Sequence, residues 1–169
     1  MGLQVKQGVG NKVGEQIWVV FSLAGEKYAA PISHIREVIK IPEIIKIPES
    51  LDFVEGVVNI RGSVIPVIDL KFRLKLGKAD GDRNSRVMIV DVGGVQAGLI
   101  VDHVSEVMRI HHQYIQPTPT MTCRVDAHYI FGVANMGGNM IILLDLVHVF
   151  SEEQQGMLAE ATYNQGGEL

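Results

Sequence analysis

The residues of this chain that could support chemistry are two glycine pairs, two neighbouring histidines and one cysteine. Gly93-Gly94 and Gly137-Gly138 lie in neither a P-loop nor a strand-to-helix Gly-x-Gly-x-x-Gly context, so they predict turns rather than a phosphate site. His111 and His112 are adjacent, and adjacent side chains of a strand point to opposite faces. No Cys or further His lies at metal-ligand spacing from them, and Cys123 has no neighbouring base in the sequence. These residues therefore predict neither a metal site nor a catalytic thiol.

The remaining candidates recur along the chain, which favours structural roles for them. Asp69 and Asp145 each precede a short amphipathic stretch, where a carboxylate can accept hydrogen bonds from the free backbone N–H groups of a helical turn. His34 and His103 also occupy matching positions, which indicates packing or capping. No constellation of an active site remains, and we expect a protein that is not an enzyme and uses no cofactor.

These matching positions belong to an internal repeat. The stretch Gly56–Leu70, GVVNIRGSVIPVIDL, recurs 76 positions later at Gly132–Leu146 as GVANMGGNMIILLDL. Upstream, HIREVIKI at His34–Ile41 matches HVSEVMRI at His103–Ile110 with an offset of 69. The pairs of residues that are identical between the two long stretches are Gly56/Gly132, Val57/Val133, Asn59/Asn135, Gly62/Gly138, Ile65/Ile141, Asp69/Asp145 and Leu70/Leu146.

Each repeat predicts the order strand, strand, helical turn, strand, long loop, strand, strand. In the first repeat, we expect strands at 17–23, 27–32, 37–41, 57–60 and 64–68. Five short strands without a long helix are expected to close into a small barrel, because closure removes exposed edges. The predicted fold is therefore mostly β, with two five-stranded barrels side by side, short helical turns and a C-terminal helix. Their facing surfaces should hold a continuous core, since about 70 residues alone bury too little apolar surface.

Composition sets the domain boundaries and excludes some classes of partner. We expect a disordered lead at 1–15, a first barrel at 16–77, a charged linker at 78–85, a second barrel at 86–146, a C-terminal helix at 147–160 and a flexible tail at 161–169. A net charge of −4 gives no basic footprint for nucleic acid. Neither a membrane span nor the apolar core of a signal peptide is visible, so we expect a cytoplasmic protein without direct membrane insertion.

The run GVVNIRGSVIPVIDLKFRL, preceded by IREVIKI and followed by VDHVSEVMRI and DLVHVF, resembles the CheW family of bacterial chemotaxis coupling proteins. The resemblance spans roughly residues 16–158. It implies two intertwined β-barrels and an adaptor without chemistry of its own. The implied partners are the regulatory domain of a CheA-type histidine kinase and the cytoplasmic tip of chemoreceptors. It also implies a protein that is monomeric alone and is recruited to receptor arrays at the inner face of the membrane.

Two other functions are compatible with the sequence. The same module could serve another motility or surface-sensing pathway, and a pair of barrels could also bind a small molecule in the groove between them. The lack of convergent polar residues weakens the small-molecule hypothesis.

Arg61 is the most informative departure from the repeat. The matching position in the second repeat is Gly137, so the turn itself does not require a charge. Arg61 is therefore either a solvated turn residue or a contact for a partner. Glu37 is its plausible ion partner, although Glu37 could instead face Lys40, and Glu106 keeps the carboxylate where the arginine is absent.

The family resemblance implies a receptor-binding side made of Arg61, Glu37, Ile35 and Gly56. From the residues alone, Ile35 is equally a core position and Gly56 a backbone turn. For the kinase side, the segment IPEIIKIP carries more isoleucine than a solvated loop needs. Ile44, Ile45 and Ile47 are therefore candidates for contact with the kinase, with packing beneath the loop as the alternative.

Overall fold

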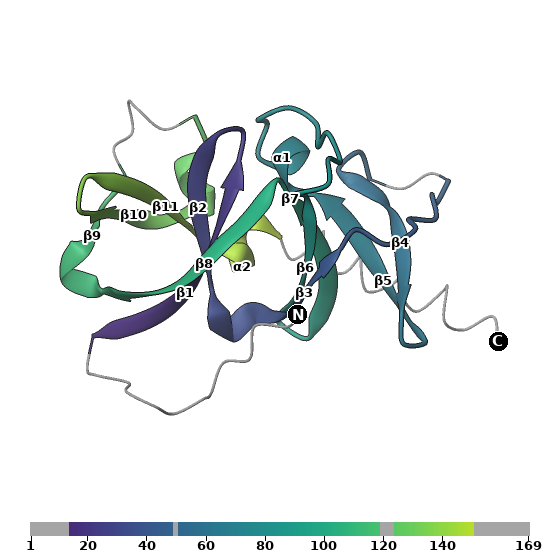
Figure 1. Cartoon of the computed structure of the whole chain (residues 1–169), viewed down its shortest axis with the longest axis horizontal. Helices are drawn as coiled ribbons and strands as arrows, with labels where there is room; N and C mark the ends of the chain where they lie inside the picture. The colour runs from purple at the N-terminus through teal and green to yellow at the C-terminus, as the bar shows by residue number, and fades with distance from the viewer. Residues whose placement is uncertain (1–13, 49–50, 119–123, 151–169) are drawn as a thin grey trace.

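The computed structural model describes residues 14–48, 51–118 and 124–150, which form two β-sheets (Figure 1). The strands are β1 (Glu15–Leu23), β2 (Glu26–Pro31), β3 (Ile35–Lys40), β4 (Val54–Ile60), β5 (Ser63–Asp69), β6 (Arg86–Val92), β7 (Val95–Val101), β8 (His103–His111), β9 (Ile115–Gln116), β10 (Ile130–Met136) and β11 (Asn139–Leu144). The α-helices α1 (Leu70–Arg73) and α2 (Leu146–Val149) have one turn each, and the 3-10 turns are η1 (Ile32–His34), η2 (His112–Tyr114) and η3 (Ala127–Tyr129). The predicted mostly-β class is confirmed.

The two repeats exchange their first hairpins. One sheet has the order β8-β1-β2-β11-β10-β9, and the other has the order β3-β6-β7-β5-β4. The β1–β2 hairpin of the first repeat thus lies among strands of the second repeat, and the β6–β7 hairpin of the second lies among strands of the first (Figure 1). The exchange is joined by two equivalent parallel pairs, β2 with β11 and β5 with β7.

The two sheets do not coincide with the expected ranges 16–77 and 86–146. Those ranges describe the repeats in the sequence, but each sheet takes strands from both of them. The physical reason is that a hairpin has two edges to satisfy, and β1–β2 satisfies them against β8 and β11 of the other repeat. The sheets are therefore intertwined, as the family resemblance implied.

The main core lies between the sheets and contains apolar side chains of both. Phe21 and Tyr28 come from one sheet and Met88 and Leu99 from the other, and all four are fully buried. Two smaller clusters occupy matching places in the two sheets, one around Trp18 and one around Val58. The expected continuous core between the facing surfaces is confirmed.

A partly buried ion pair ties the exchanged β1–β2 hairpin to α1. Lys71 of α1 is only 8% exposed, and its Nζ lies 3.2 Å from Oδ2 of Asp102. The same carboxylate oxygen accepts a 2.9 Å hydrogen bond from the backbone N–H of Ala24, which turns the hairpin in a left-handed conformation. One carboxylate thus satisfies a buried ammonium and a turn N–H at the contact between the two sheets.

Both expected aspartate caps are present. The Asp69 carboxylate accepts a hydrogen bond from the backbone N–H of Phe72, and that of Asp145 accepts from Val147 and His148. α2 ends at Val149, and Phe150 follows it in an extended conformation, buried in the shared core. The remainder of the predicted helix, 151–160, lies outside the described residues, as do the lead up to residue 13 and the tail at 161–169.

Within the described residues, no helix is long and apolar enough to cross a membrane.

The hairpin exchange predicts that neither repeat folds alone. Cleaving the chain between the exposed residues Gly81 and Asp82 separates β1–β5 from β6–β11. Each fragment would lack the neighbours of one hairpin and half of the shared core, so circular dichroism should show no cooperative thermal transition for either fragment. An equimolar mixture should recover the native spectrum and a cooperative transition. Independent cooperative folding of one fragment would contradict the exchanged arrangement.

Candidate functional site

Arg61 occupies the tip of the β4–β5 hairpin in a conformation that normally suits glycine. Its φ is +49° and that of Gly62 is +86°, which is the two-residue turn with positive φ at both central positions. In the second repeat, Gly137 and Gly138 take the same conformation with φ of +62° and +90°. A left-handed conformation costs a non-glycine residue about 1–2 kcal/mol. The first repeat therefore keeps an arginine at a position where the second repeat has a glycine, which takes this conformation with less strain.

The Arg61 side chain points into solvent and meets one carboxylate. Its side chain is 78% exposed, and its guanidinium donates to Oε1 of Glu37, whose side chain is 23% exposed. Of the two alternatives open in the sequence, Glu37 therefore faces Arg61. Because β3 and β4 are the opposite edges of their sheet, this contact shows that the sheet curls until its two edges meet.

Gly56 lies in β4, where the backbone of the segment after β3 approaches so closely that there is no room for a side chain. It is buried, has a φ of +153°, and a Cβ atom at this position would lie 2.2 Å from the carbonyl oxygen of Ile45. Ile45 exchanges two 2.8 Å backbone hydrogen bonds with Val57 there. Gly132 repeats the feature, since its Cβ would lie 2.7 Å from the side chain of Ile115. Gly56 thus lets the segment after β3 pair with β4 and cover that edge.

The other residues of the predicted receptor-binding side differ in exposure. Ile35 is partly buried against the shared core, so it supports β3 from beneath. The strand bulges between Ile35 and Glu37. Arg36 lies in this bulge and pairs with Asp91 at 3.1 Å. The bulge re-aims Glu37, which brings its carboxylate to Arg61.

The three isoleucines proposed for the kinase side separate into different environments. Ile44 packs against the cluster around Val58, whereas Ile45 is 59% exposed. Ile47 is of intermediate exposure. Ile45 therefore offers most apolar surface to a partner, while the backbone of the same residue is fixed by its bonds to Val57.

Sequence reasoning missed Arg73, which joins the two repeats. Its Nε donates to the carbonyl of Val149 at 3.1 Å and its NH1 to the Tyr129 hydroxyl at 3.0 Å. Its guanidinium carbon also lies 5.2 Å from the centre of the Phe53 ring and 4.9 Å from that of Tyr129. The position that matches Arg73 in the second repeat is Val149 itself, so the departure from the repeat that singles out Arg61 would also have found Arg73.

In the described part of the chain, no group of three or more His, Cys, Asp or Glu side chains is placed to hold a metal ion.

Comparisons with known proteins agree with this architecture. A family model described as the CheW-like domain matches residues 18–154. The chain is 29% identical over 154 residues to the chemotaxis protein CheW of Klebsiella aerogenes, an alignment that covers 91% of this chain and 92% of the relative. It is 30% identical over 145 residues to the chemotaxis protein CheW of Treponema pallidum, covering 83% and 85%. The crystal structure of the scaffolding protein TtCheW from Thermoanaerobacter tengcongensis superposes with a TM-score of 0.76 at 41% identity, covering 88% of this chain and 96% of that one.

The close approach at Gly56 predicts a large loss of stability for Gly56→Ala. The added methyl group would collide with the Ile45 carbonyl, and the alanine would have to keep a φ that is unfavourable for a residue with a side chain. The free energy of unfolding, measured in urea, should therefore fall by about 3 kcal/mol or more. Gly62→Ala is the matched control, because its φ is also positive but nothing lies within 4 Å of the added carbon. It should lose only about 1 kcal/mol. Equal losses for the two variants would contradict the packing role of Gly56.

Proposed function

The chain belongs to the CheW-like domain family, and from this premise we propose that it is a non-catalytic adaptor that couples chemoreceptors to a CheA-type histidine kinase. Such an adaptor needs two separate surfaces on one rigid frame. The shared core and the exchanged hairpins supply the frame, since the two sheets bury their main apolar faces against each other. In this proposal the protein works in the cytoplasm and is recruited to receptor arrays at the inner face of the membrane.

The receptor side of the proposal is carried by Arg61. Its backbone is held in a strained conformation that a glycine relieves in the other repeat, and strain of this kind persists where function requires the side chain. Glu37 orients the guanidinium, while the Arg61 side chain as a whole remains 78% exposed. An exposed, oriented arginine is suited to the carboxylates of a partner, because its planar donors can engage them in pairs. Ile35 and Gly56 contribute by shaping β3 and the covered edge of β4.

The kinase side of the proposal centres on Ile45. This residue presents its side chain at the covered edge of the barrel, on backbone that is bonded to β4. Because the backbone of Ile45 is already held, binding through this side chain costs little further backbone entropy, which suits an anchor in an adaptor interface. Ile44 and Ile47 flank this anchor.

Arg61→Gly tests the receptor side without loss of stability. The glycine relieves about 1 kcal/mol of turn strain and removes an exposed ion pair worth about 0–1 kcal/mol, so the free energy of unfolding should change by less than about 1 kcal/mol. The dissociation constant for a receptor cytoplasmic tip, measured by calorimetry, should rise about tenfold or more.

Arg36→Ala is the matched control for this test, because Arg36 is 61% exposed and also pairs with a carboxylate nearby. Its affinity for the receptor tip should stay near that of the unchanged protein. Full receptor affinity in Arg61→Gly, or an equal loss in Arg36→Ala, would rule out the receptor role of Arg61.

Ile45→Glu tests the kinase side. Because the side chain is 59% exposed, the substitution should leave thermal stability almost unchanged and weaken binding to the isolated kinase regulatory domain about tenfold or more. Receptor-tip binding should persist. Ile44→Glu is the contrasting variant, since it places a charge against an apolar cluster and should lower the melting temperature. Unaltered kinase affinity in Ile45→Glu would remove Ile45 from this interface.

A further inference from the structure

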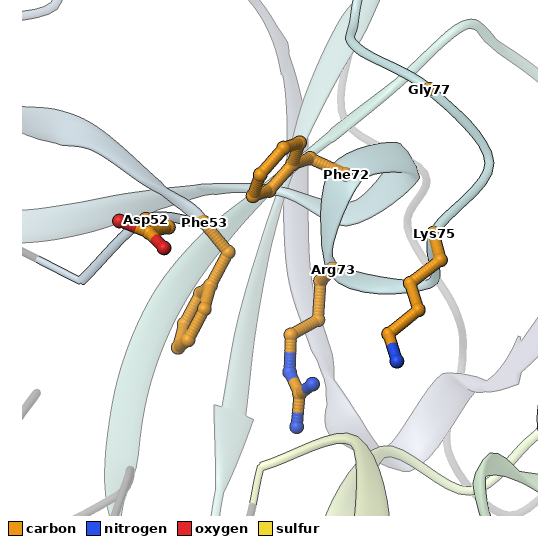
Figure 2. A pocket seen from close by; sticks show the side chains of 6 residues that line it. All are labelled: Asp52, Phe53, Phe72, Arg73, Lys75 and Gly77. Atoms are coloured by element: carbon orange, nitrogen blue, oxygen red, sulfur yellow. The ribbon is translucent and has the colours of Figure 1, made fainter.

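A pocket of about 430 Å³ opens beside α1 in the first repeat (Figure 2). Its lining consists of Asp52, Phe53, Phe72, Arg73, Lys75 and Gly77. Its volume lies within the range of small-molecule sites, which is about 300–1,000 Å³. The pocket is separate from the proposed receptor contact, because α1 follows the end of β5 that is opposite to the Arg61 turn.

Two phenylalanine rings give the pocket an apolar wall (Figure 2). Phe53 is 8% exposed and Phe72 is 36% exposed. Asp69 holds the backbone of both residues, because its N–H donates to the Phe53 carbonyl at 2.9 Å and its carboxylate accepts from the Phe72 N–H at 3.2 Å. Rings on a fixed backbone suit a flat aromatic ligand, since pairs of aromatic rings gain from offset and edge contacts.

Positive charge surrounds this apolar wall. Lys75 lines the pocket, and Nζ of Lys78 lies 5.9 Å from the centre of the Phe72 ring. Both lysines are exposed, and neither forms an ion pair with another residue of the described ranges. Arg73 differs from them, because its bonds to Val149 and Tyr129 hold its guanidinium in place as a fixed positive charge. An aromatic wall beside such charges suits a ligand that joins a ring to an anionic group.

Asp52 limits the charge that such a ligand can carry. Its side chain is exposed and lies across the pocket from Lys75 in Figure 2. A ligand with a second negative charge at its far end would bring that charge towards the Asp52 carboxylate, and like charges repel. A single carboxylate is therefore favoured over a polyanion.

The repeat does not require this lining. The positions that match Asp52, Phe72 and Arg73 in the second repeat carry two histidines and a valine, at 128, 148 and 149. Lys75 also has a φ of +60°, a conformation in which a helix end usually carries glycine or asparagine. A lysine that is kept in strained backbone beside a pocket points to a role for its side chain in binding.

We propose that this pocket binds a small aromatic monocarboxylate. The ring of the ligand lies against Phe53 and Phe72, its carboxylate pairs with Lys75 and Lys78, and Arg73 adds a fixed positive charge. The proposal goes beyond the adaptor function, since it concerns a small-molecule ligand at a surface separate from the Arg61 turn.

Amide chemical shifts of the isotope-labelled full chain test the binding, with indoleacetate as the probe. The amides of Phe53, Phe72 and Lys75 should shift in a saturable way, with a dissociation constant of about 1 mM or tighter. Tryptamine has the same ring with a positive charge, and acetate has the carboxylate without a ring. Neither control should give saturable shifts at these amides, because each lacks one of the two features that the lining recognises.

Lysine variants separate recognition by charge from simple apolar adsorption. Lys75→Gly with Lys78→Ala removes both charges and relieves the strain at position 75, so the variant should stay folded and bind indoleacetate about tenfold or more weakly. Lys40→Ala is the matched control, since Lys40 is an exposed lysine that does not line the pocket, and its affinity should be unchanged.

The proposal would be overturned if indoleacetate gave no saturable shifts at the lining, or if tryptamine shifted the same amides with equal affinity. Unchanged affinity in the variant at positions 75 and 78 would also overturn it. None of these outcomes bears on receptor or kinase binding, because no protein partner is present.

Discussion

The exchange of hairpins between the repeats is the constraint on which the rest of the structure depends. Parallel pairing of β2 with β11 and of β5 with β7 places strands of each repeat in the sheet of the other. The large core then forms between the two sheets, and the Lys71–Asp102 ion pair fixes the turn of the exchanged β1–β2 hairpin to α1. Because the main core takes side chains from both sheets, the two sheets hold a defined relation to each other, which an adaptor with two binding surfaces requires.

Departures from the repeat mark the residues that the frame does not explain. Gly56 and Asp69 recur as Gly132 and Asp145, and in both repeats they perform the same backbone task. Arg61 has no counterpart and keeps an unfavourable φ, which is the observation behind the proposed partner contact. Arg73 also lacks a counterpart, but its bonds to Tyr129 and Val149 show that its role is to join the repeats. Two arginines that both depart from the repeat therefore differ in role, and it is their contacts that distinguish them.

Much of the fold followed from local patterns, whereas the partners of the strands did not. Alternation and turn glycines predicted the hairpin around Arg61, and the helix caps at Asp69 and Asp145 followed from the residue type before an apolar turn. Which strand lies beside β2 depends on contacts across more than a hundred residues, so composition and spacing predicted one barrel per repeat instead of an exchange. The helical turn expected after Asp145 is present as α2, and most of the predicted range 147–160 lies outside the described residues. The Arg61–Glu37 contact needed the curl of the sheet, which no local pattern encodes.

The central claim is that one rigid frame presents a receptor surface and a kinase surface at the same time. Sedimentation velocity of the full chain mixed with a kinase regulatory domain and a receptor cytoplasmic tip tests it most directly. A frame with two separate surfaces should give a single boundary that contains all three proteins and sediments faster than either pairwise complex. Two pairwise complexes that compete for the protein, with no species containing all three, would contradict it.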